Sequence, residues 1–156
     1  MSKIIASPIE WSYLAGIFDG EGCVRATENK PLGTAKSPRF RIVVGITNTS
    51  ERLINWIHNS FGGSVQVKHL PGRDKATKIC YLVAFNPKAG EALLNGMMPY
   101  LIVKRDQAIM ALKLRAMVKS FSPSITKQGR GIVLPLEEIV KRRGVLQSLS
   151  DLKKVQ

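Results

Sequence analysis

The sequence has few cysteines, no long apolar run and little acidic charge. Its two cysteines, Cys23 and Cys80, match no zinc-ligand spacing, and we expect both to be small buried side chains in a reducing compartment. No apolar run approaches the roughly 20 residues that cross a membrane, and residues 1–10 have one basic residue and no signal-like apolar core. These absences predict an intracellular protein without a membrane partner. The length suits one compact domain over residues 1–156.

The shortage of acidic residues is the first indication of a partner. Eleven Asp and Glu stand against 24 Lys and Arg, which gives a formal net charge of +13 and an isoelectric point near 10.2. Residues 23–90 contain eleven of the basic residues and three acidic ones. Such an excess is typical of a protein that binds a polyanion, although a basic surface that serves only solubility is an alternative. An anionic lipid surface is less favoured, because the sequence has no basic amphipathic helix with a bulky apolar face.

Apolar periodicity predicts an α+β fold in which an antiparallel sheet packs one face on helices. Residues 10–19 have the apolar spacing of a helix, and residues 39–47 alternate, with Phe40 and Ile42 on one face and Arg39 and Arg41 on the other. The other expected elements are strands at 23–27, 65–68 and 79–85, and helices at 50–61, 87–96, 103–121 and from Pro135 onward with a break near Gly144. The core would cover about residues 8–122, and a C-terminal helical extension about 123–156.

Small residues recur at every fourth position of the first helix, at Ser12, Gly16 and Gly20. A glycine inside a helix costs about 1 kcal/mol relative to alanine. The usual return is the close backbone approach of a second helix along the small-residue stripe. Gly20 and Gly22 could instead form only a helix C-cap and turn, but that interpretation leaves Gly16 unexplained.

Two acids, Asp19 and Glu21, stand at the end of this helix. Negative charge at a helix C-terminus is unfavourable by roughly 0.3–1 kcal/mol. A divalent cation would offset that cost, because carboxylates and helix-end carbonyls are the oxygen ligands that Mg²⁺ prefers. An acid pair at a helix end is also commonly just a solvated end, so these two residues alone leave both interpretations open.

The segment Leu14–Gly22 (LAGIFDGEG) resembles the LAGLIDADG motif of the homing endonucleases. Identical residues stand at Leu14, Ala15, Gly16, Asp19 and Gly22, while Phe18, Gly20 and Glu21 are variations of kinds that the family tolerates. Residues 43–52 and 99–104 also resemble the corresponding stretches of single-motif members. The resemblance covers most of residues 10–120 and does not extend beyond Pro123.

The resemblance implies a site-specific endonuclease that cleaves both strands of a long pseudo-palindromic DNA target as a homodimer, encoded by a mobile intron or intein-like element. It implies an αββαββα core in which two motif helices pack at a two-fold axis and the sheets form a saddle over the major groove. The implied cofactor is Mg²⁺, with Mn²⁺ as a substitute, and no organic cofactor is expected. Metal ions between paired carboxylates would activate a water and stabilise charge on the phosphate.

The resemblance also assigns catalytic roles. Glu21 would be the metal-binding acid, with the Gly20 carbonyl beside it as a further ligand. Lys104 would stand near the attacking water, and Asn48 and Arg52 would complete a polar pocket. The family more often has aspartate at the position of Glu21 and glutamine at that of Asn48.

Exposed strand faces would read the DNA, because a two-stranded ribbon fits the major groove, where Arg and Lys pair with guanine and Gln or Asn with adenine. The candidates for base contacts are Arg25, Thr27, Arg39, Arg41, Gln66 and Lys68. The candidates for phosphate contacts, mostly in loops, are Lys30, Lys36, Arg73, Lys75 and Lys78. The motif helices would meet through Ser12, Gly16, Gly20 and Asp19, with Asp19 bracing the helix ends.

Two other functions stay open at this point. A protein of the same fold could have lost cleavage and act as an RNA-splicing maturase or a non-cleaving DNA-binding protein, although Glu21 and Lys104 argue against that loss. A basic ribosome-associated structural protein would explain the charge but not the glycine-striped helix.

Overall fold

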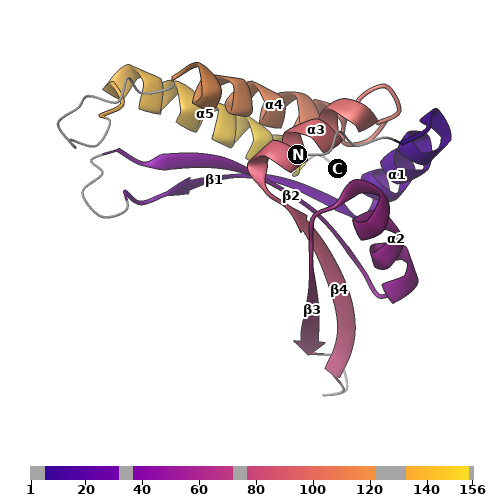
Figure 1. Ribbon diagram of the computed structural model, residues 1–156. Coiled ribbons are helices and arrows are strands. Elements are labelled where there is room, and N and C mark those ends of the chain that lie inside the picture. Colours follow the sequence, from indigo (N-terminus) through magenta and orange to yellow (C-terminus); the bar gives the residue numbers. More distant parts are fainter. Residues whose placement is uncertain (1–5, 32–36, 72–76, 122–132, 155–156) are drawn as a thin grey trace, which may run out of the picture. The chain divides into compact units, whose positions relative to one another are not determined.

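The fold is α+β, with an αββαββα core followed by two further helices, as the sequence predicts (Figure 1). The computed structural model describes residues 6–31, 37–71, 77–121 and 133–154. The elements are α1 Pro8–Glu21, β1 Gly22–Asn29, β2 Arg39–Asn48, α2 Glu51–Phe61, β3 Ser64–Pro71, β4 Thr77–Phe85, α3 Pro87–Met97, α4 Arg105–Ser120 and α5 Leu136–Leu152. The four strands form one sheet in the order β1-β2-β4-β3. None of the described helices is long and apolar enough to cross a membrane.

The chain divides into two compact units. The first, here called the motif unit, comprises Met1–Val24 and Val43–Arg105. The second, the C-terminal unit, comprises Arg25–Ile42 and Asp106–Gln156. Strands β1 and β2 each begin in one unit and end in the other, so the two hairpin strands are shared between the units.

Helix α1 of the motif unit is defined by its caps. The Ser7 hydroxyl accepts the backbone N–H of Glu10, and the Glu10 carboxylate accepts the backbone N–H of Ser7 at 2.8 Å, which is a complete capping box. The helix ends where Gly22 turns to an extended backbone and donates its N–H to the Phe18 carbonyl. It is longer than the predicted 10–19 at both ends, because the capping box and the acid-bearing last turn extend it.

The core of the motif unit lies between this helix, α2, α3 and one face of the sheet. Its fully or nearly buried apolar side chains include Leu14, Phe18, Val44, Ile46, Ile54, Ile57, Phe61, Val83, Phe85, Leu93, Leu94 and Met97. The Trp11 ring lies 5.0 Å from that of Phe61 and contacts Gly96 so closely that no Cβ would fit there. A glycine at this position therefore lets α3 approach α1.

Helix α2 is bounded by a side-chain cap at its start and by two glycines at its end. Ser50 caps α2, and Gly62 and Gly63 end it with φ angles of +80° and +92°, a conformation that favours glycine. Strands β3 and β4 are longer than predicted and extend past α2 in Figure 1. The side chains of residues 64–69 are exposed on both faces of β3.

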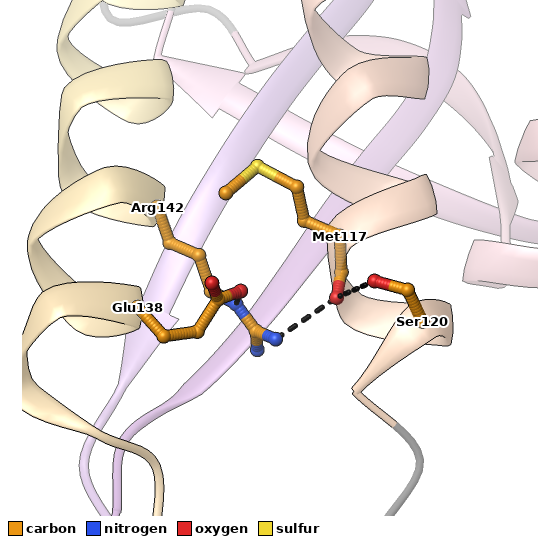
Figure 2. A network of polar contacts seen from close by, with 4 residues as sticks. All are labelled: Met117, Ser120, Glu138 and Arg142. Carbon is orange, nitrogen blue, oxygen red and sulfur yellow. Dashed lines mark hydrogen bonds and ion pairs between the residues drawn. The ribbon is translucent and has the colours of Figure 1, made fainter.

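The C-terminal unit is built on α4 and α5, which lie side by side (Figure 1). Arg142 of α5 is 4% exposed; its Nε donates to Glu138 at 2.7 Å and its Nη2 donates to the Met117 carbonyl of α4 at 2.9 Å (Figure 2). The guanidinium thus joins the two helices while its charge is paired, as burial requires.

Two sequence predictions are wrong. Helix α5 runs without a break through Gly144, because Val145 and Leu149 are buried and their packing outweighs the cost of one glycine. Cys23 is exposed rather than buried, because it alternates with Val24, whose side chain takes the core face of β1. Cys80 is buried as predicted.

Candidate functional site

The C-terminal end of α1 is joined to the segment that precedes α4. Both carboxylate oxygens of Asp19 accept backbone N–H groups, from Ile102 and from Lys104, each at 2.8 Å. The Lys104 ammonium donates a hydrogen bond back to the Asp19 carbonyl oxygen. These three contacts span 83 to 85 residues of sequence and fix the Lys104 side chain at the end of the motif helix.

The position of Lys104 has an electrostatic reason. The last carbonyls of a helix carry partial negative charge, so a cation there is stabilised. The last turn of α1 has no basic residue of its own. Lys104 reaches that negative helix end from a distant segment.

Glu21 ends the same helix but is placed differently from Asp19. Its side chain is exposed, and among the described residues it has no hydrogen-bond or ion-pair partner. Gly20, beside it, is also exposed. An unpaired carboxylate next to helix-end carbonyls offers the oxygen donors that a hard divalent cation takes.

A complete metal site would need more donors than these. Within the described part of the chain, no three His, Cys, Asp or Glu side chains gather in one place. Among the described residues, the Glu21 carboxylate and the neighbouring Gly20 carbonyl are the oxygen donors that we consider at this helix end, fewer than a metal ion's full coordination.

Asn48 and Arg52 lie at the junction of β2 and α2. The Asn48 side-chain oxygen accepts the backbone N–H of Ser50 at 2.8 Å, so this amide supports the turn into α2. Arg52 is exposed and lines a hollow of about 450 Å³ with Tyr13, Ser50, Leu53 and Trp56. Among the described contacts, neither Asn48 nor Arg52 bonds to Glu21, Asp19 or Lys104, and the hydrogen bonds at the helix end join only Asp19 to Ile102 and Lys104.

The small-residue stripe of α1 is exposed along its length, at Ser12, Gly16 and Gly20. A Cβ added at Gly16 or Gly20 would meet nothing within 4 Å, so packing within the described chain does not require a glycine at either position. Beside the stripe, Ile9 is 79% exposed and Tyr13 is 56% exposed. Sequence reasoning missed these two, although their spacing of four follows the same helix face.

The candidates for DNA contacts in the motif unit lie on β3 and β4. Gln66, Lys68 and Lys78 are exposed. The register pairs Gln66 with Leu82 and Lys68 with Cys80, which places these side chains on the sheet face opposite the buried Val83 and Phe85. Arg73 and Lys75 lie outside the described residues, as does Lys36.

The remaining candidates belong to the C-terminal unit. Arg25, Lys30, Arg39 and Arg41 are exposed, and Thr27 is half-buried. Along β2 these arginines alternate with Phe40 and Ile42, which are buried, so the predicted separation into a charged face and a core face is confirmed. Among residues 25–31 and 37–42, basic and polar side chains thus share the face that the helices leave open.

Comparison with solved structures identifies the fold. No protein-family model and no curated protein matches the sequence. The structure superposes on the homing endonuclease I-TnaI with a TM-score of 0.67 and 16% identity, over 96% of this chain and 95% of that one. For the homing endonuclease I-CvuI in complex with its target, the TM-score is 0.66 and the identity 18%, over 93% and 82%.

A longer homing endonuclease has the same fold over part of its length. The LAGLIDADG enzyme I-LtrWI, bound to target DNA, superposes with a TM-score of 0.59 and 18% identity, over 88% of this chain and 44% of that one. The chain thus corresponds to less than half of this longer protein. The chain has the fold of the LAGLIDADG homing endonucleases, which its motif predicts.

Proposed function

We propose that the protein is a metal-dependent, site-specific DNA endonuclease that acts as a homodimer. The observation that carries the proposal is the end of α1, where Glu21, an acid without a partner among the described residues, stands two residues after Asp19, whose carbonyl accepts a hydrogen bond from the Lys104 ammonium. The fold supports DNA as the substrate, since I-CvuI and I-LtrWI were each solved with target DNA. The net charge of +13 agrees with a polyanionic substrate.

The exposed faces of the strands supply the DNA contacts. Arg39 and Arg41 would contact base edges in the major groove, where a guanidinium pairs with guanine. Gln66 and Lys68 would do the same from β3, and Lys78 would contact phosphates. Phosphate contacts position the protein without reading sequence, so the two groups have separable effects on specificity.

The chemistry follows from the donors at the helix end. Glu21 and the Gly20 carbonyl would hold Mg²⁺ or Mn²⁺, which when bound supplies an activated water and stabilises charge on the scissile phosphate. Lys104 would donate a hydrogen bond to the attacking water or to a phosphate oxygen, because Asp19 holds its backbone and its ammonium in place. Neither His58 nor His69 is needed as a base.

In this proposal, a second copy of the chain supplies the second active site. One chain carries one Glu21, whereas cutting both DNA strands needs an acid for each. The exposed Ser12-Gly16-Gly20 stripe would let two motif helices approach closely, and the exposed Ile9 and Tyr13 would add apolar contact beside it. A two-fold dimer would then recognise a pseudo-palindromic target.

A selection from random DNA tests the proposal directly. The purified protein is incubated with a randomised duplex library in Mg²⁺ or in Ca²⁺, and the cut and bound fractions are sequenced. We expect one pseudo-palindromic sequence among cut molecules in Mg²⁺ and the same sequence among bound, uncut molecules in Ca²⁺. Binding without cleavage in Mg²⁺ would indicate a non-cleaving DNA-binding protein, and a preference for structured RNA would indicate a maturase.

A further inference from the structure

Strand β1 is tied to α5 by a bidentate ion pair. The Nη2 of Arg143 donates to Glu28 Oε1 at 2.6 Å, and its Nε lies 3.0 and 3.2 Å from the two carboxylate oxygens. The guanidinium keeps the pKa of the Glu28 carboxyl below its ordinary value of 4.5, so the pair is charged at neutral pH. Two parallel hydrogen bonds fix the relative orientation of the groups as well as their distance.

Strand β2 is held from the same side. The Leu134 backbone N–H, two residues before α5, donates to the hydroxyl of the buried Ser37 at 2.6 Å. The Arg142 guanidinium lies 5.6 Å from the centre of the Phe40 ring. Figure 2 shows the same guanidinium directed at α4, where it bonds to Met117. Helix α5 and Leu134 before it therefore contact residues near the end of β1 and near the start of β2, while Arg142 joins α5 to α4.

The strand residues that contact α5 alternate with the proposed DNA-reading residues. Glu28 follows Thr27, and Phe40 lies between Arg39 and Arg41, so each contact with α5 is made on the strand face opposite those side chains. All of these residues belong to the C-terminal unit. Glu21 and Lys104 belong to the motif unit. Helix α5, which contacts β1 and β2, therefore carries none of the proposed catalytic residues.

We propose that the Glu28–Arg143 pair is a specificity-determining clasp, which positions the DNA-reading face of β1 and β2 without itself touching DNA. The inference rests on the proposed function. Base readout depends on donors held within about 0.5 Å of their productive position, and this accuracy needs supporting side chains. A partly exposed ion pair, here 26% exposed at Glu28 and 55% at Arg143, contributes little to stability, so orientation is its main effect.

The test compares clasp variants with matched variants on the same helix. Glu28→Gln and Arg143→Gln break the clasp, and Arg143→Lys keeps the charge but loses the bidentate geometry. The exposed pair Glu137–Lys141 of α5 provides charge-matched controls, Glu137→Gln and Lys141→Gln. The reversed pair Glu28→Arg with Arg143→Glu rebuilds an ion pair with its charges exchanged. Randomised-library binding gives the base preference at every position of the selected target, and Arg41→Ala identifies the positions that β2 reads.

We expect Glu28→Gln, Arg143→Gln and Arg143→Lys each to weaken base preference by about fivefold at the target positions that β1 and β2 read. This is part of the discrimination that one base contact supplies. The DNA concentration for half-maximal cleavage should rise, while the cleavage rate at saturating DNA stays unchanged. The double variant Glu28→Gln with Arg143→Gln should be no worse than either single one, and the reversed pair should recover part of the preference. The Glu137 and Lys141 variants should keep the parent profile.

The outcomes separate this inference from the proposed function. If the parent protein selects a DNA sequence and the clasp variants keep the same base preferences, the role of the clasp is overturned and the proposed function is not. An equal change in the Glu137→Gln control, or a fall in the saturated cleavage rate that parallels the loss of preference, would overturn the clasp in the same way. A parent protein that selects no DNA sequence would overturn the proposed function and the clasp with it.

Discussion

Two acids at the end of α1 differ in what surrounds them. Both carboxylate oxygens of Asp19 accept backbone N–H groups of the segment before α4. Glu21 is exposed and has no partner among the described residues. Their separation is two residues, which turns the side chains to different sides of the helix end. An acid that holds the segment before α4 and the acid that we propose to bind metal therefore stand close together in sequence, and substitutions should separate their roles.

Glu21→Gln should abolish Mg²⁺-dependent cleavage while specific DNA binding in Ca²⁺ stays within a few-fold of the parent. The amide keeps the size of the side chain but loses the charge that a divalent cation requires. Cleavage and binding are measured on the selected target, with Glu137→Gln as the control that removes one exposed carboxylate elsewhere. Cleavage at the parent rate would exclude Glu21 as a metal ligand.

Asp19→Asn should lower both stability and cleavage. An amide offers one acceptor oxygen, so one of the N–H groups of Ile102 and Lys104 loses its partner, which costs about 1–3 kcal/mol. Urea unfolding measures the loss of stability, and cleavage at saturating DNA measures the displacement of Lys104. Glu21→Gln is the matched comparison, since it should stop cleavage without lowering stability. An Asp19→Asn protein with full stability and full activity would contradict the bracing role.

Helix α1 shows at the scale of an element what the sequence can and cannot predict. Its apolar stripe and its small-residue face follow from local spacing, and the strand alternation around Phe40 and Ile42 does too. The contact between Asp19 and Lys104 joins segments 85 residues apart, and that between Glu28 and Arg143 joins segments 115 apart. No periodicity connects such residues, so only the folded chain reveals them. The family resemblance named Lys104, but not the backbone contacts that hold it.

Gly16→Leu should separate the stability of one chain from its association. Nothing within 4 Å opposes a side chain at this position, and leucine favours a helix over glycine by up to about 1 kcal/mol, so the monomer should be at least as stable as the parent. The same leucine should overpack a contact between two motif helices, yielding monomers with little double-strand cleavage. Analytical ultracentrifugation with and without DNA measures the oligomeric state.

Gly144→Leu is the matched control for that experiment. Gly144 is also a helix glycine with open space around it, but it lies on α5, away from the motif helix in sequence and in unit. It should gain similar helix stability and leave association unchanged. Gly16→Leu protein that dimerises as well as the parent would rule out the stripe as the interface.

For the whole molecule, charge should dominate affinity. Each neutralised phosphate contributes about −0.9 to the slope of log K against log salt, so binding by this strongly basic chain should weaken steeply as salt rises. Arg41→Ala should relax preference at particular base pairs with little change in slope, whereas Lys78→Ala should weaken all sequences alike and make the slope shallower by about 1. Titrations at several salt concentrations distinguish the two. Identical, sequence-independent effects would show that the β2 face does not read bases.

The division into two units has a consequence for how such a protein could change its target over evolutionary time. The proposed metal-binding acid Glu21 and Lys104 lie in one unit, while Arg25, Arg39 and Arg41 lie in the other with α4 and α5. In the proposed endonuclease, substitutions that retune base contacts in the second unit would leave the chemistry of the first intact. A lineage whose target drifts could therefore follow it by small steps within residues 25–42 and 106–156, each intermediate still being able to cut DNA.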